Sequence, residues 1–277
     1  MMHSDRGLSQ KLERTEARAS AAFVESHAAL VPGSGAEWIE VAGAYALFDG
    51  PSSPVTQSFG LGLFEAATSE ILDTIEMFFR QRNAPVFHEV SPLADAGLLR
   101  LFGERGYRPC ELTSVLVREI DHVIALNPKL SKDVTTRNIG PGESELWATT
   151  AAAGWATEGE GLAAFMLDLG RICTNATNGF PMIAELEGKA ISAGMLYVFD
   201  DIAMLAGAST VPEGRRRGGQ LALLDARLRF AAERGCRVAM MGASPGSQSQ
   251  RNAETNGFRV AYTRTKWQLP FPNRTQT

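Results

Sequence analysis

The chain has 277 residues, of which 44% are hydrophobic and 21% are charged. This balance excludes an intrinsically disordered chain, and the length suits two domains of ordinary size. The formal net charge of -4 gives no general attraction to nucleic acid or to an anionic membrane. No stretch approaches the roughly 18 apolar residues of a membrane span, and the charged N-terminus has no apolar signal-peptide core.

The cysteines and histidines are scattered along the chain. Cys110, Cys173 and Cys236 are far apart and odd in number, and no two histidines have helical ligand spacing. This pattern argues against a disulfide framework and against a zinc site. We therefore expect a protein of a reducing compartment, the cytoplasm, with no metal and with neither nucleic acid nor membrane as a partner.

Helices and strands are expected to alternate along the first half. An amphipathic helix over residues 9–30 ends at Pro32-Gly33. Further strands are expected at 38–48, 55–64, 86–90 and 111–120, and further helices at 69–81 and 94–104. Residues 121–132 read as a linker, because Asn127-Pro128 breaks any regular element.

Helices and strands are expected to alternate along the second half as well. Helices are expected at 143–156, 161–174, 219–234 and 248–255, and strands at 182–187, 190–199, 202–211, 237–241 and 259–267. Glu187-Gly188 is typical of a hairpin turn between two of these strands. The predicted class is α/β (α+β).

An internal repeat supports two related halves. Ser91-Pro92 precedes a helix that ends at Gly106-Tyr107-Arg108 and leads into a strand. Ser244-Pro245 likewise precedes a helix that ends at Gly257-Phe258-Arg259 and leads into a strand. Because the same element order surrounds both copies, we expect two domains, at residues 1–125 and 126–277.

The candidate binding element is the segment Arg215-Arg216-Arg217-Gly218-Gly219-Gln220. A β-branched strand end leads through this turn directly into an amphipathic helix. Unpaired N–H groups and the positive end of the helix dipole make such a helix start a seat for phosphate. Glycines let the ligand approach the backbone, and the arginines add charge. A basic triplet alone is more often a solvated turn, but this context favours anion binding.

Other motifs of this kind fail on inspection. There is no GxxxxGK[ST] sequence, so a P-loop is excluded, and Gly60-Leu61-Gly62 lacks the third glycine of a dinucleotide fingerprint. Residues 242–246 fit the G-x-S-x-G elbow of α/β-hydrolases. However, Pro245 has no oxyanion N–H, and the last histidine, His122, precedes the serine instead of following it.

The segment around Arg215 resembles motif A of the GNAT acetyltransferase superfamily, whose pattern is Arg/Gln-x-x-Gly-x-Gly/Ala. Arg215 and Gly218 match this pattern, whereas Gln220 stands in place of the final Gly/Ala. The order of elements over residues 134–267, including Gly257-Phe258, also resembles that fold. The resemblance implies a tandem GNAT protein, in which each domain has a mostly antiparallel mixed sheet flanked by helices, and acetyl-CoA as co-substrate.

The resemblance also implies where the cofactor lies. Acyl-CoA would enter where the strand at 202–211 separates from the strand at 237–241, with its pantetheine arm along Thr210 and Val211. The pyrophosphate would be held by the N–H groups of Arg216, Arg217, Gly218, Gly219 and Gln220. Arg215, Ser249 and Asn252 complete the expected cofactor-binding set.

The implied reaction is direct attack of a primary amine, on a small molecule or a peptide, at the acetyl thioester. A backbone N–H near the separating strands would polarise the carbonyl. Many family members protonate the leaving thiolate with a tyrosine, but Ala253 stands at that position. Ser247, Ser249 or water would have to replace the tyrosine. A thiol of pKa about 8.5 also leaves fairly readily without a proton.

The sequence indicates the amine-binding site less specifically than the cofactor-binding site. Trp155, Glu158 and Glu160 lie between the first two helices of the second half, where the family shapes the acceptor site. Glu158 is the candidate general base or ammonium binder, although a solvated surface carboxylate is the commoner role. A homodimer is left open.

The first half lacks the phosphate-binding sequence. At the corresponding position it has residues 64–69, which contain neither glycine nor arginine, and Glu65 would repel phosphate. We expect a degenerate copy that shapes the acceptor cleft or supports the fold. The competing hypothesis is that the whole chain is a non-catalytic acyl-CoA-binding or regulatory module. Its motives are Ala253 in place of the tyrosine and an amine-binding site that the sequence does not identify.

Overall fold

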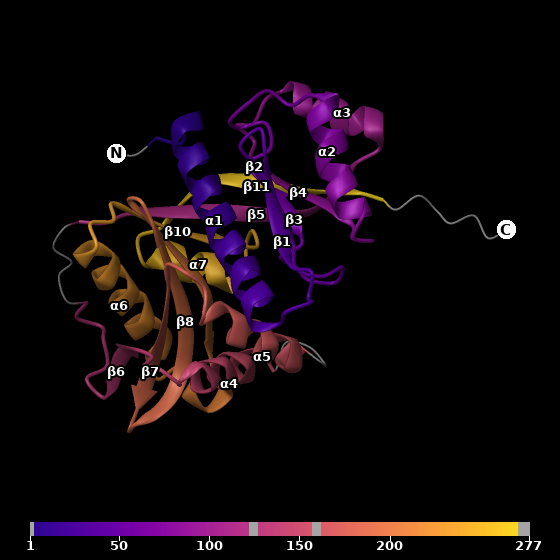
Figure 1. Cartoon of the computed structure of the whole chain (residues 1–277). Coiled ribbons are helices and arrows are strands. Elements are labelled where there is room, and N and C mark those ends of the chain that lie inside the picture. Colours follow the sequence, from indigo (N-terminus) through magenta and orange to yellow (C-terminus); the bar gives the residue numbers. More distant parts are fainter. Residues whose placement is uncertain (1–2, 122–126, 157–161, 271–277) are drawn as a thin grey trace. The chain divides into compact units, whose positions relative to one another are not determined.

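The computed structural model describes residues 3–121, 127–156 and 162–270 (Figure 1). The chain forms two compact units, one of residues 1–116 with 242–277 and one of residues 117–241. Each unit combines a mixed sheet with helices. The predicted α/β class is therefore confirmed.

The first unit contains most of the N-terminal elements and the last two of the chain. Its strand order is β1-β2-β3-β4-β11-β5, in which β3 and β4 run parallel and the other registered pairs run antiparallel. Its helices are α1 (Arg6–Leu30), α2 (Ser69–Arg80), α3 (Gly97–Arg105) and α7 (Gln248–Thr255). Its strands are β1 (Glu37–Val41), β2 (Ala44–Phe48), β3 (Gln57–Phe59), β4 (Val86–Val90), β5 (Arg108–Glu119, whose end enters the second unit) and β11 (Arg259–Leu269).

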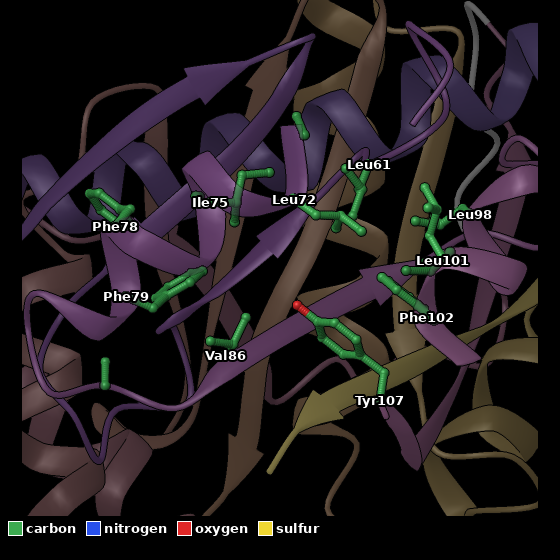
Figure 2. Close-up of a cluster of buried hydrophobic side chains, with 14 of the residues drawn as sticks. Leu61, Leu72, Ile75, Phe78, Phe79, Val86, Leu98, Leu101, Phe102 and Tyr107 are labelled. Carbon is green, nitrogen blue, oxygen red and sulfur yellow. The ribbon is translucent and has the colours of Figure 1, made fainter. Parts of the chain in front are cut away.

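Both faces of this sheet bury apolar side chains, because successive strand residues point to opposite faces. On one face α1 packs against Leu47 and Phe59. On the other face α2 and α3 pack in a larger cluster, which Figure 2 shows with Phe79 and Phe102 among its labelled members. Both of these rings are fully buried, so the first unit has a substantial core of its own.

A buried group of charges lies beneath α1 in the same unit. The Arg264 guanidinium bonds both carboxylate oxygens of Glu16 at 2.6 Å and forms an ion pair with Glu89 at 2.9 Å. Glu13 accepts a 2.7 Å hydrogen bond from the Tyr262 hydroxyl and lies 3.5 Å from Arg264. Burial raises the pKa of Glu13 to about 7, because it penalises the charged carboxylate by more than the Arg264 guanidinium favours it.

The second unit is contiguous in sequence. Its strand order is β10-β9-β8-β7-β6, in which β9 and β10 run parallel and the other pairs antiparallel. Its strands are β6 (Val134–Asn138), β7 (Gly179–Leu186), β8 (Lys189–Phe199), β9 (Ile202–Thr210) and β10 (Val238–Ala243, whose end enters the first unit). Its helices are α4 (Ser144–Trp155), α5 (Leu162–Cys173), the 3-10 turn η1 (Pro212–Gly214) and α6 (Gly219–Glu233).

Helices cover both faces of this second sheet. The Ser209 hydroxyl donates to Ala151 O in α4 at 2.9 Å. The hydroxyl of the next residue, Thr210, forms a hydrogen bond with Ser192 Oγ. Gly219, at the start of α6, packs against this same Ser192 oxygen. Neighbouring strand residues point to opposite faces, so α4 and α6 lie on opposite sides of the sheet. Helices α4 and α5 lie side by side (Figure 1).

Several predicted turns and caps are confirmed. Glu187 and Gly188 both have positive φ and join β7 to β8 as a two-residue hairpin turn. The repeated Gly106 and Gly257 both end helices in the left-handed region, at φ of 80° and 84°. The aromatic residue after each glycine is buried, so the two copies of the sequence repeat share one structural role.

Two predictions about the elements are wrong, and one element was not predicted. The strand expected at 38–48 is a hairpin, because Ala42 and Gly43 form a turn with positive φ. The strand expected at 55–64 shortens to β3, because Gly60 and Gly62 have positive φ. Strand β6 was not predicted as an element, because its sequence Val-Thr-Thr-Arg-Asn is polar and half-exposed.

The first of the two compact units is not contiguous in sequence. Residues 242–277 belong to the first unit, because β11 pairs antiparallel with β4, from Thr265 opposite Val90 to Leu269 opposite Val86. No helix among the described residues has the length and hydropathy to cross a membrane. The same residues contain no group of three or more side chains suited to hold a metal ion.

Candidate cofactor-binding site

The arginine–glycine turn joins β9 to α6 in the second unit. Arg216 and Gly218 both have the left-handed backbone conformation, with φ of 61° and 89°, and alternate with residues of negative φ. Such alternation turns successive N–H groups toward one concave surface, which is a common way to bind an anion. The predicted strand–turn–helix arrangement is therefore confirmed.

The start of α6 leaves its first N–H groups without a side-chain cap. Its N-cap is Gly218, whose side chain offers no acceptor, and the Gly218 carbonyl accepts first from Ala222 N, at 3.0 Å. The N–H groups of Gly219, Gln220 and Leu221 precede that bond, so they lack intrahelical partners. Arg217 differs from the expectation, because its N–H already donates to Gly214 O at 3.3 Å.

The two glycines of the turn have different roles. Gly218 needs to be glycine because of its positive φ, and its nearest neighbour is Ser131, whose Cβ would lie 3.4 Å from an added Cβ. Gly219 is buried, and a Cβ there would overlap the Ser192 hydroxyl. Packing on β8 is therefore a further reason for glycine at position 219, beside the close ligand approach that the sequence predicts.

Positive charge surrounds this helix start. Arg215, Arg216 and Arg217 are all exposed. One Arg215 nitrogen, Nη2, donates to Gly154 O at the end of α4, at 3.4 Å. Within the described part of the chain, Arg216 and Arg217 form no ion pair with a carboxylate, so their charge is available to an anion.

Strand β9 is paired on one side only over its second half. Its register with β10 ends at Met204 opposite Met240, while its pairing with β8 continues to Thr210 opposite Ser192. Along Leu205–Thr210 no described strand pairs with the β10 side of β9. An extended ligand can therefore add its own hydrogen bonds to this free edge.

A β-bulge interrupts β9 within the same stretch. Met195 lies opposite Ala206 and Ala193 opposite Ser209, so Gly207 and Ala208 share one partner, Gly194. Gly207 has a φ of 58°, as a bulge residue often does. A bulge leaves a backbone group unpaired, which makes it a candidate source of the N–H that polarises a carbonyl. No sequence signal beyond Gly207 itself indicated this feature.

Helix α4 fixes the end of β9 from one face. Gly154 packs so closely that a Cβ there would lie 2.5 Å from Ser209 Oγ and 2.9 Å from Thr210 N. On the other face, the Ser192 and Thr210 hydroxyls are 2.8 Å apart. The strand end is therefore held on both sides, as a binding edge requires.

The remaining predicted site residues fall in three places. Thr210 and Val211 lie at the strand end, where Val211 N donates to Ile191 O at 3.0 Å. Ser249 and Asn252 lie on α7 in the first unit, where the Asn252 amide oxygen accepts from Gln248 at 2.7 Å. The second unit therefore does not itself bring those two residues to the turn. Glu158 lies outside the described residues.

The corresponding turn of the first unit is arranged differently. The carbonyls of Gly62 and Leu63 face α1, where Leu63 O accepts from Arg6 Nη2 and Gln10 Nε2, each at 2.8 Å. The start of α2 is capped by the Thr68 hydroxyl, which accepts from Ile71 N at 3.3 Å. The start of α2 thus has a side-chain cap, whereas the start of α6 has none.

A scan against protein-family models and a search of curated proteins found no match. Solved structures do resemble the chain. A GCN5-related N-acetyltransferase from Kribbella flavida has a TM-score of 0.62 and 17% identity, over 93% of this chain and 96% of that one. The corresponding values for a GCN5-related N-acetyltransferase from Sphaerobacter thermophilus are 0.56 and 17%, over 81% and 76%.

A third similar structure bears on the two-unit organisation. A tandem GNAT protein from the clavulanic acid biosynthesis pathway has a TM-score of 0.57 and 10% identity, over 98% of both chains. Identities this low show the fold alone. The chain therefore has the fold of the GNAT acetyltransferases, over the whole length of a tandem GNAT protein.

Proposed function

We propose that the protein is an N-acetyltransferase that moves an acetyl group from acetyl-CoA to a primary amine. The observation that carries this proposal is the uncapped start of α6 at Gly218, placed where β9 has a free edge. The described residues fit the cofactor, because N–H groups and arginines suit a pyrophosphate and a strand edge suits the amides of a pantetheine arm.

The cofactor supplies the activated acetyl thioester, and the chain's own residues bind and orient it. The N–H groups of Arg216 and Gly218–Gln220 would hold the pyrophosphate, while Arg215 and Arg217 add charge. The edge of β9 up to Thr210 and Val211 would align the arm. An unpaired N–H at the Gly207–Ala208 bulge would polarise the thioester carbonyl as negative charge develops on its oxygen.

Proton transfer is assigned less directly. The side chain of Ala253 cannot donate a proton, and this residue is buried in packing, at 3% exposure. The leaving thiolate would take its proton from Ser247, Ser249 or water. Glu158 remains the proposed base or ammonium binder, and the acceptor is an amine of a small molecule or peptide.

The proposal assigns cofactor binding to the second unit alone. The capped start of α2 and the inward-facing Leu63 carbonyl support a first unit that no longer binds CoA. Titration calorimetry should then give one CoA per chain. Two equivalents per chain would contradict this assignment. A cytoplasmic location and independence from metal belong to the same proposal, which leaves a homodimer open.

A second candidate is a non-catalytic acyl-CoA-binding or regulatory module, which Ala253 at the expected acid position favours. A thiol-release assay with acetyl-CoA and a panel of amines separates the two. Turnover with any amine supports the enzyme, whereas tight CoA binding without turnover on the panel supports the module. As a control, Gly218→Trp should weaken CoA binding about tenfold to a thousandfold, and unchanged affinity would mean that the pyrophosphate lies elsewhere.

A further inference from the structure

The indole of Trp155, the last residue of α4, has an unexplained donor. Its Nε1 atom is buried and has no hydrogen-bond partner among the residues that the structure describes. Buried donors almost always have partners, because an unmade hydrogen bond there is costly. Such a group therefore needs a reason, and one reason is a ligand that supplies the acceptor.

A second tryptophan on the same helix shows the ordinary situation. Trp147, two turns earlier, donates from Nε1 to Met182 O at 3.0 Å and lies 3.4 Å from Gly194 O. Both acceptors are backbone carbonyls of neighbouring strands. Among the described residues, one indole of α4 thus has backbone acceptors and the other has none.

The unsatisfied indole is attached beside the proposed cofactor edge. Its neighbour Gly154 packs against the backbone nitrogen of Thr210, the last residue of β9, and the Gly154 carbonyl accepts from Arg215 in the turn. Consecutive Cα atoms are about 3.8 Å apart, so Trp155 begins one short step from both contacts.

We propose that the Trp155 indole N–H donates a hydrogen bond to a carbonyl oxygen of the acyl-CoA arm where the arm passes the end of β9. The inference rests on the proposed function and extends it. The arm offers carbonyl oxygens separated by apolar segments, and an indole offers one donor on a flat apolar ring, so the two are chemically matched.

The test is Trp155→Phe, which keeps an aromatic ring and removes the donor. We expect the affinity for CoA, measured by calorimetry, to fall roughly 2- to 12-fold, which corresponds to one ordinary hydrogen bond. The matched control is Trp147→Phe, with the same loss of ring volume. It should lower the melting temperature more than Trp155→Phe does, because it also removes the hydrogen bond to Met182.

A spectroscopic readout makes the assignment direct. The chain has four tryptophans, so a nitrogen–proton correlation spectrum contains four indole signals, and the one missing in Trp155→Phe identifies Trp155. Adding CoA should move that signal downfield, to a higher proton chemical shift, as formation of a hydrogen bond does. An unmoved signal, or an unchanged CoA affinity in the variant, would overturn the inference.

The outcomes also separate this inference from the proposed function. Wild-type protein that binds no CoA would refute the proposed function and this inference together. Wild-type binding with an unaffected variant would refute the inference alone. A variant with normal CoA affinity but a raised KM for the amine would show that the donor serves the acceptor, and would also overturn it.

Discussion

Replacing Gly219 by alanine tests whether packing, and not ligand approach, requires glycine there. An added Cβ would overlap Ser192 Oγ and lie 3.1 Å from Ile191 Cδ1. Overpacking of this kind costs about 1–3 kcal/mol, and the better helix propensity of alanine returns less than about 1 kcal/mol. We expect a net loss of about 1–2 kcal/mol in the free energy of unfolding, measured by urea denaturation.

The partner substitution sharpens this prediction. Ser192→Ala should itself cost about 1 kcal/mol, because the hydroxyl bonds Thr210 at 2.8 Å. In the Gly219→Ala/Ser192→Ala double variant the overlap with the hydroxyl is gone, so the loss should be smaller than the sum by roughly 1 kcal/mol. Additive losses, or a Gly219→Ala protein as stable as wild type, would refute the packing argument.

Three further outcomes are expected. Because Glu13 has a pKa of about 7 in the fold and an ordinary value of 4.5, the stability it contributes is complete below pH 4.5 and lost as the pH rises through 7. Glu13→Gln should remove that decline, of roughly 3 kcal/mol, from urea denaturation between pH 4 and 8, and an unchanged slope would contradict it. Arg216→Gln with Arg217→Gln should weaken CoA binding several-fold at low salt and less at high salt, whereas equal loss at both would exclude a charge effect. Gly106→Ala, at φ 80° with open space around it, should lower stability by about 1 kcal/mol in thermal denaturation, and no loss would mean that the cap relaxes.

Local sequence signals predicted the local features of the fold. The turn at Glu187-Gly188, the helix ends at Gly106 and Gly257, and the strand–turn–helix around Gly218 depend on residues adjacent in the chain. Glycine and β-branched residues fix such geometry through their own backbone preferences. These features could therefore be predicted from the sequence without knowledge of tertiary contacts.

Features that depend on contacts between residues far apart in sequence could not be predicted. The need for glycine at position 219 arises from Ser192, which is far away in sequence, and the pairing of β11 with β4 spans most of the chain. The bulge at Gly207–Ala208 depends on register with β8. The orphan indole of Trp155 likewise became visible only when its surroundings were known.

The return of β11 to the first unit affects the order in which the chain can fold during synthesis. Residues 117–241 form a contiguous unit, so they can fold as soon as they leave the ribosome. Residues 1–116 depend on a later segment, because Arg264, the cation that balances Glu13, Glu16 and Glu89, is translated after residues 117–241. A nascent or truncated N-terminal fragment would hold three carboxylates in an apolar setting without that partner. Residues 1–116 are thus made before the contiguous unit but completed after it.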